Sequence, residues 1–119
     1  MVNFVMKREI VAYKEHFRRF YRSQDVKVRR KINYILDLIR FEDQIPAKFF
    51  KQIGGYEGIY EIRIITSFRS IRVLCMLDIG GRLILLNGFV KKGQKTPVKE
   101  LRIAYKLTKQ FKSEKQGTT

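Results

Sequence analysis

The chain has 119 residues and a mass of 14.2 kDa, the size of one domain with one modest core. Hydrophobic residues make up 45% of it, which excludes a disordered polyelectrolyte. Lysine and arginine number 26 against 11 acidic residues, and this net charge of +15 indicates an anionic partner: nucleic acid, an acidic membrane surface or an acidic protein.

Several other classes of protein are excluded by simple counts. The apolar runs have the length of strands, far short of the ~20 residues of a membrane-spanning helix. The first eight residues lack the apolar stretch of a signal peptide. One cysteine and one histidine cannot form an internal disulfide or an ordinary zinc site. We therefore expect a cytoplasmic protein without a metal or other cofactor, which does not act on a membrane.

The N-terminal part favours a short strand followed by helices. Residues 8–13 favour the strand, and aromatic residues at helical spacing predict a first helix over 13–21. His16 falls in this region, where we expect it to be a surface residue without a catalytic role.

A second helix shows the cleanest amphipathic pattern of the chain. Ser23 and Asp25 are candidate N-caps. The helix should end near 41–43, before Pro46, and residues 46–58 are expected to form a loop with a short helical piece. The apolar stripe of the helix consists of Val28, Ile32, Ile35, Leu36 and Ile39.

Three segments rich in Ile, Leu and Val then predict an antiparallel meander. Gly80-Gly81 suits the tight turn of the last hairpin because glycine tolerates positive φ. Cys75 lies among apolar neighbours, which favours a buried strand residue over a nucleophile. The three predicted strands are 60–66, 70–78 and 82–90.

A final helix is predicted to open at Thr96-Pro97, with the proline in the first turn. We expect a single domain over residues 1–111, followed by a polar, frayed tail over 112–119. The predicted fold is therefore α+β, with N-terminal helices and a C-terminal helix packed on a small twisted antiparallel sheet. The packing stripe of the final helix consists of Val98, Leu101, Ala104, Tyr105, Thr108 and Phe111.

Positive charge is concentrated near the C-terminus. Residues 91–115 hold nine basic and two acidic residues, a net charge of +7. Any one of these lysines is best explained as a solvated surface residue, but a basic helix face can follow a phosphate backbone. The residues that form one face of the final helix are Lys99, Arg102, Lys106 and Lys109.

Two arginines are expected to lie within the sheet. Alternation places Glu61 and Arg63 on one face, and Arg72 is the only charge in an apolar run. An ion pair with Glu61 explains these arginines, and so does a phosphate site completed by Lys91 or Lys92 at the end of the third strand. Tethered basic groups would also stabilise the extra negative charge of a phosphoryl-transfer transition state.

Residues 58–105 resemble the HigB-like branch of the RelE/ParE toxins. The resemblance rests on three short stretches and is most specific in the third, which runs into a helix carrying Glu100 and Ala104. These stretches are Gly58-Ile59-Tyr60-Glu61-Ile62-Arg63, then Arg72-Val73, then the segment LLNGFVKKGQKTP that begins at Leu85.

The resemblance implies a RelE-like RNase fold and the toxin of a type II toxin–antitoxin system. Such nucleases enter the ribosomal A site and cut mRNA without a metal, through attack of the 2′-hydroxyl on the adjacent phosphorus. The implied partners are mRNA on the ribosome and a cognate helix-turn-helix antitoxin, with operator DNA bound only through the antitoxin complex.

Roles for individual residues are implied by the resemblance, position by position. Arg72 would bind the phosphate and the transition state with help from Arg63, and Lys92 or Lys95 would protonate the leaving 5′-oxygen. Lys91 would contact RNA. The basic face of the final helix, and not the resemblance, adds Lys99, Arg102 and Lys106 as candidate RNA contacts. Candidates for the base are Glu61 and Tyr105, although Glu61 also suits an ion pair and Tyr105 also suits the core.

The sequence departs from the branch at two positions. Asn87 stands where a histidine is frequent, and Gly93 where a threonine is frequent. Two other functions stay open: a ParE-type toxin that acts on DNA gyrase, and a non-catalytic basic module that binds RNA or DNA.

Overall fold

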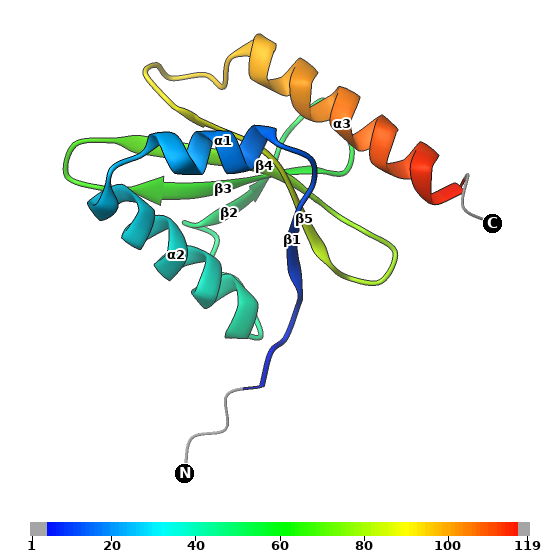
Figure 1. Ribbon diagram of the computed structural model, residues 1–119, viewed down its shortest axis with the longest axis horizontal. Coiled ribbons are helices and arrows are strands. Elements are labelled where there is room, and N and C mark those ends of the chain that lie inside the picture. The colour runs from blue at the N-terminus through cyan, green and yellow to red at the C-terminus, as the bar shows by residue number, and fades with distance from the viewer. Residues whose placement is uncertain (1–4, 117–119) are drawn as a thin grey trace.

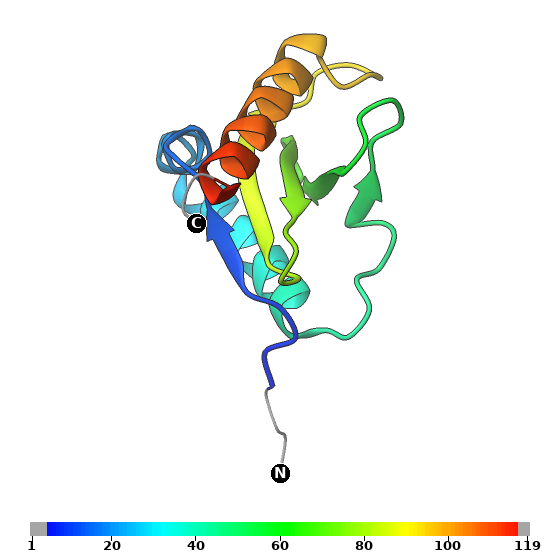
Figure 2. The ribbon, with the colours of Figure 1, turned by 90° about the vertical axis from the view of Figure 1, so that its right-hand side faces the viewer.

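A five-stranded sheet forms the centre of the structure, a computed structural model that describes residues 5–116. The strand order is β1-β5-β4-β3-β2, so that β1 and β5 lie side by side at one edge and β2 lies at the other (Figure 2). The strands are β1 (Ile10–Ala12), β2 (Phe50–Gln52), β3 (Ile59–Ile65), β4 (Ser70–Leu77) and β5 (Leu83–Val90). The helices are α1 (His16–Ser23), α2 (Val26–Phe41) and α3 (Val98–Gln116).

The predicted α+β architecture is confirmed, with one addition to the sheet. Strands β3 to β5 pair antiparallel, as expected from their short connections, and β2 also pairs antiparallel with β3. The first strand pairs parallel with β5 and makes the sheet mixed. A parallel neighbour requires a long crossover, and here the whole chain from α1 to β4 lies between the two strands.

The two faces of the sheet build two separate cores. On one face, α1 and α2 cover alternate residues of β3, β4 and β5, including Ile62, Val73 and Leu85. On the other face, α3 covers Leu74, Met76, Ile84 and their neighbours. Figure 1 shows α2 and α3 on opposite sides of the strands. Because side chains alternate along a strand, Glu61, Arg63 and Arg72 lie on the α3 side.

The N-terminal helices are close to the prediction. The first begins at His16 rather than at residue 13, after Lys14 adopts a φ of 58°. The Asp25 carboxylate caps α2 by accepting a hydrogen bond from the Val28 amide (2.9 Å), whereas Ser23 ends α1 and donates to the Phe20 carbonyl (2.6 Å). The apolar stripe of α2 is buried as predicted, and the helix ends at Phe41.

The short helical piece expected within residues 46–58 is only a turn at 47–49, and a strand comes directly after it. Residues Phe50–Gln52 form β2, which pairs with the free edge of β3, and the Phe50 ring stacks on Tyr60 with 4.9 Å between centroids. A three-residue strand carries almost no periodic signal, so only its pairing partner reveals it.

The last helix differs from the prediction in the side that it buries. Leu101, Ala104 and Thr108 are buried as expected, but Leu107 joins them, while Val98 and Tyr105 are exposed. The interpretation of Tyr105 as a core residue is therefore wrong. The helix packs on β4 and β5 through a face rotated away from Tyr105. It also extends to Gln116, so residues 112–116 of the expected frayed tail are helical.

Two further properties of residues 5–116 bear on the class of function. No helix in this part of the chain is long and apolar enough to cross a membrane. Within the same residues, no group of three or more His, Cys, Asp or Glu side chains is placed to hold a metal ion. His16 is exposed on α1, as expected for a surface residue.

Gly88 provides a test of the contact between α1 and β5. A Cβ at this position would lie 2.5 Å from Cδ2 of Phe20, so the aromatic ring must shift. We expect Gly88→Ala to lower the free energy of unfolding by about 1–3 kcal/mol, measured by chemical denaturation. Phe20→Leu in the same chain should recover part of this loss. Gly54→Ala, where the added Cβ meets nothing within 4 Å, should change stability little; an equal loss there would contradict the explanation.

Cys75 provides a test of the core beneath α1 and α2. It is fully buried, and burial raises the pKa of its thiol, as expected for a structural cysteine. A thiol-specific reagent at pH 8 should leave the folded protein unlabelled and should label it once denaturant unfolds it. Because the unfolded thiol ionises first, stability should fall as the pH rises above about 8.5. Rapid labelling of the folded protein would contradict the burial of this strand.

Candidate functional site

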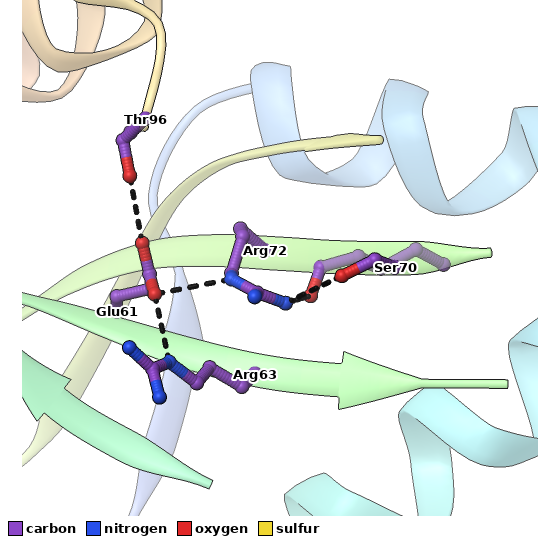
Figure 3. Close-up of polar contacts among 6 residues, drawn as sticks. Glu61, Arg63, Ser70, Arg72 and Thr96 are labelled. Carbon is purple, nitrogen blue, oxygen red and sulfur yellow. Dashed lines mark hydrogen bonds and ion pairs between the residues drawn. The ribbon is translucent and has the colours of Figure 1, made fainter. Parts of the chain in front are cut away.

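A buried carboxylate between two arginines is the most unusual feature of the sheet. Glu61 is 2% exposed and Arg72 is 7% exposed. The Glu61 Oε1 atom lies 3.0 Å from Arg63 Nε and 3.1 Å from Arg72 Nε. Figure 3 shows the carboxylate with both guanidinium groups directed toward it from β3 and β4. We call Glu61, Arg63 and Arg72 the arginine cluster.

The register of the sheet produces this cluster. Arg63 and Arg72 are direct partners across the β3–β4 pair. Like charges in directly opposed positions are destabilising, so the pair requires a countercharge on the same face. Glu61 supplies it because residues two apart on a strand point to the same side. The ion pair expected from the sequence therefore forms with both arginines at once.

The Arg72 side chain is held in a fixed orientation. Its Nη1 donates hydrogen bonds to the Ser70 hydroxyl (2.9 Å) and to the Ile71 carbonyl (3.1 Å). Its Nε is within ion-pair distance of Glu61, although the N–H is not aligned for a hydrogen bond. The third nitrogen, Nη2, takes part in none of these contacts. A guanidinium positioned in this way can bind a phosphate oxygen without first losing side-chain entropy.

The loop between β5 and α3 is fastened next to the arginine cluster at both ends. At its start, the Lys91 amide donates to the Ser70 carbonyl (2.7 Å). At its end, the Thr96 hydroxyl donates to Glu61 Oε2 (2.9 Å). Lys92 and Lys95 are exposed within this loop, and Lys91 is half-buried. The short connection therefore keeps these lysines in the neighbourhood of Arg72.

Asn87 strengthens the same connection. A β-bulge at this point of β5 turns both Leu86 and Asn87 toward the α3 side. The Asn87 side-chain amide donates to the backbone carbonyl and to the carboxylate of Glu100, both at 3.1 Å. Asn87 thus anchors the start of α3, and the sequence indicated no such role.

The basic stripe of α3 is a separate surface. Lys99, Arg102 and Lys106 are exposed, as expected. With 3.6 residues per turn, they lie on the side of the helix opposite the buried Leu101, Ala104 and Leu107. They therefore point away from the sheet, and the structure does not bring them together with the arginine cluster.

The two candidate bases differ in their surroundings. Both oxygens of the Glu61 carboxylate are engaged, by two arginines and by Thr96. Tyr105 is 44% exposed and lies edge-on to Tyr56 in the turn between β2 and β3, 6.3 Å between centroids. This turn precedes β3, so Tyr105 lies toward the end of the strand away from Arg63.

Sequence reasoning missed a second basic surface at the N-terminal helices. Residues 18–31 hold seven basic residues against the single Asp25, whose carboxylate caps α2. A basic surface was predicted only from the longer run of charges near the C-terminus. A count of basic against acidic residues along α1 and α2 would have found this surface, although its arginines alternate with core residues. These basic residues are Arg18, Arg19, Arg22, Lys27, Arg29, Arg30 and Lys31.

Replacing the shared carboxylate tests whether the cluster depends on it. Glu61→Gln keeps the shape but leaves two facing arginines without a countercharge, so the free energy of unfolding should fall by about 3 kcal/mol. Chemical denaturation measures the change. The control is Asp37→Asn, which removes an exposed carboxylate from Arg40 and should cost less than about 1 kcal/mol. Equal costs for the two variants would show that Glu61 does not hold the cluster together.

The fold is similar to that of a known toxin. A mutant of the Escherichia coli toxin RelE, solved in the free state, superposes with a TM-score of 0.58 at 12% sequence identity. The match covers 88% of this chain and 98% of that chain, which confirms the RelE-like fold expected from the sequence. No curated protein sequence matches the chain.

A family of sequences also matches most of the chain. This family is described as phage-derived protein Gp49-like (DUF891), and its match spans residues 19–109. The matched part contains the arginine cluster, the loop that carries Lys92 and Lys95, and most of α3. The chain therefore belongs to the phage-derived Gp49-like family.

Proposed function

We propose that this protein is the toxin of a type II toxin–antitoxin module, in the HigB-like branch of the RelE/ParE superfamily, and that it cuts mRNA on the ribosome. The observation that carries the proposal is Arg72, a buried guanidinium held by Glu61, Ser70 and a backbone carbonyl with one nitrogen left over. Support also comes from the RelE-like fold and the net charge of +15. The proposed site of action is the cytoplasm.

The proposed reaction is an internal transfer within the RNA. The 2′-oxygen attacks the adjacent phosphorus while the bond from phosphorus to the 5′-oxygen breaks, which leaves a 2′,3′-cyclic phosphate and a 5′-hydroxyl. Arg72 binds the phosphate and stabilises its extra negative charge in the transition state, and Arg63 adds to the field. Lys92 or Lys95 gives a proton to the leaving 5′-oxygen.

The proton of the 2′-hydroxyl passes to solvent in this scheme. Glu61 is committed to both arginines and acts as a positioning residue, and Tyr105 lies toward the other end of β3. The positive charge of the cluster favours the ionised 2′-oxygen close to the phosphate. Lys91 and the stripe of Lys99, Arg102 and Lys106 would contact other parts of the RNA.

The proposed partners are those that this role requires. The toxin would bind mRNA in the ribosomal A site, and a cognate helix-turn-helix antitoxin would neutralise it. Because the toxin is strongly basic, we expect the segment of the antitoxin that covers the arginine cluster to be acidic. Operator DNA would be bound only by the complex of the two proteins.

Arg72→Lys tests the proposed chemistry while keeping the positive charge beside Glu61. Lysine lacks the planar fork of donors, so cleavage should fall about 100-fold or more. The measurement is inducible expression in a bacterium, with protein synthesis followed over time and mRNA 5′ ends mapped. Wild type should arrest translation and produce new 5′-hydroxyl ends inside translated frames. Arg40→Lys, on α2 and paired with Asp37, is the matched control and should behave as wild type.

Other outcomes separate the alternatives. Full toxicity of a folded Arg72→Lys protein would overturn the assignment of Arg72. Growth arrest with DNA damage signalling and without new mRNA ends would favour a toxin that acts on DNA gyrase. Salt-dependent RNA binding without arrest or cleavage would favour a non-catalytic binding module.

A further inference from the structure

An exposed aromatic residue occupies the turn between β3 and β4, close to the arginine cluster. Phe68 is 92% exposed, and Val26 at the start of α2 is 52% exposed. Figure 1 shows this turn next to the junction of α1 and α2. Isolated apolar residues are common on protein surfaces, but Phe68 and Val26 line the same hollow, which calls for an explanation. The hollow has a volume of about 650 Å³ and lies between residues 25–28 and residues 66–69.

Hydrogen bonds within the turn fix the backbone that carries the ring. The Thr66 hydroxyl accepts hydrogen bonds from the amides of Phe68 (3.3 Å) and Arg69 (2.9 Å), and the Thr66 amide donates to the Arg69 carbonyl (2.9 Å). The backbone of all three residues is therefore ordered before any ligand binds. A backbone that is already ordered lowers the cost of ordering on binding.

The charge around the hollow is positive. Lys27 and Arg69 line it, and the carboxylate of Asp25 is turned to the Val28 amide at the start of α2. A planar ring beside cationic side chains suits single-stranded nucleic acid, because a base stacks on the ring and a phosphate pairs with the cations. A purely apolar partner would leave Lys27 and Arg69 without a counterion.

Ser70 links the turn to the arginine cluster along the chain. Because the hollow lies on the α2 side of the sheet and the cluster on the α3 side, RNA that contacts both would pass around this end of the sheet. Ser70 comes directly after Arg69, its hydroxyl accepts from Arg72, and its carbonyl accepts from Lys91. Phe68 and Arg72 are four residues apart, at most about 14 Å along an extended chain. Stacked nucleotides rise about 3.4 Å each, so a strand with its phosphate at Arg72 reaches Phe68 within about four nucleotides.

We propose that Phe68, with Arg69 and Lys27, forms a second RNA subsite in which the ring stacks on an unpaired base within about four nucleotides of the scissile phosphate at Arg72. This inference rests on the proposed function of the arginine cluster and adds a position at which the protein senses whether the RNA is single-stranded. A base inside a duplex is not free to stack on the ring, so the subsite favours unpaired RNA.

Tryptophan fluorescence can report stacking at position 68, because the chain contains no tryptophan and an introduced indole would be the only one. Phe68→Trp is titrated with an eight-nucleotide single-stranded RNA at low salt, and the emission of the introduced indole should be quenched as the RNA binds. The matched control is Ile79→Trp in the turn between β4 and β5, where the native side chain is fully exposed. Its emission should change little. Equal quenching in both variants would overturn the subsite, since it would reflect general charge attraction.

Affinity measurements on the same RNA separate stacking from simple apolar contact. Stacking of one base contributes about 1–3 kcal/mol, so Phe68→Ala should weaken binding by about 5- to 150-fold. Phe68→Leu, which stays apolar but offers no aromatic face, should weaken it nearly as much, and Phe68→Trp should not. Ile79→Ala should bind as wild type. An unchanged affinity for Phe68→Leu would overturn the stacking role.

The outcomes also distinguish this inference from the proposed function. If Phe68→Ala binds RNA normally while Arg72→Lys loses cleavage, the subsite is wrong and the function of the arginine cluster stands. If the wild-type protein cuts no mRNA in cells, the proposed function fails, whatever the fluorescence shows. If Phe68→Ala keeps RNA binding but loses binding to a protein partner, the hollow is a protein interface and the inference is overturned.

Discussion

One buried carboxylate makes the central arrangement of this protein possible. Arg63 and Arg72 face each other across neighbouring strands, and without Glu61 the two charges would repel inside a poorly solvated sheet. The orientation of the Glu61 carboxylate is fixed, because its second oxygen accepts a hydrogen bond from Thr96. The result is a rigid group of charges that is costly to build, and such groups persist where function needs them.

Helices support the cluster from both sides of the sheet. Beneath the sheet, α1 and α2 cover an apolar core that contains the neighbours of both arginines, including Ile62 and Val73. Above it, α3 covers β4 and β5, and its start is tied to Asn87 at the bulge of β5. The loop before α3 is therefore short and anchored, and Lys92 and Lys95 stay exposed in the neighbourhood of the arginines.

Basic residues form more than one surface, and the surfaces face different directions. The stripe on α3 points away from the sheet, whereas Lys27 at the start of α2 and Arg69 line the hollow at Phe68. A small protein that inserts between large RNA surfaces would contact RNA on several sides, which agrees with a proposed site of action on the ribosome. An enzyme that bound only a free oligonucleotide would need one such surface. The net charge of +15 is thus better explained by several basic surfaces that face different directions than by one strongly basic site.

The sequence by itself determined the order of the long elements, the stripe of α2, the three central strands and the place of Cys75, because each rests on periodicity within one segment. It also indicated that Glu61 belongs with Arg63 and Arg72, since a lone arginine in an apolar run requires a partner. Tertiary structure alone decided the rest. The pairing of β2 with β3, the rotation that exposes Tyr105, and the bonds of Thr96 and Asn87 all join segments distant in the chain. Local patterns cannot encode such contacts, because their energy appears only when both segments are in place.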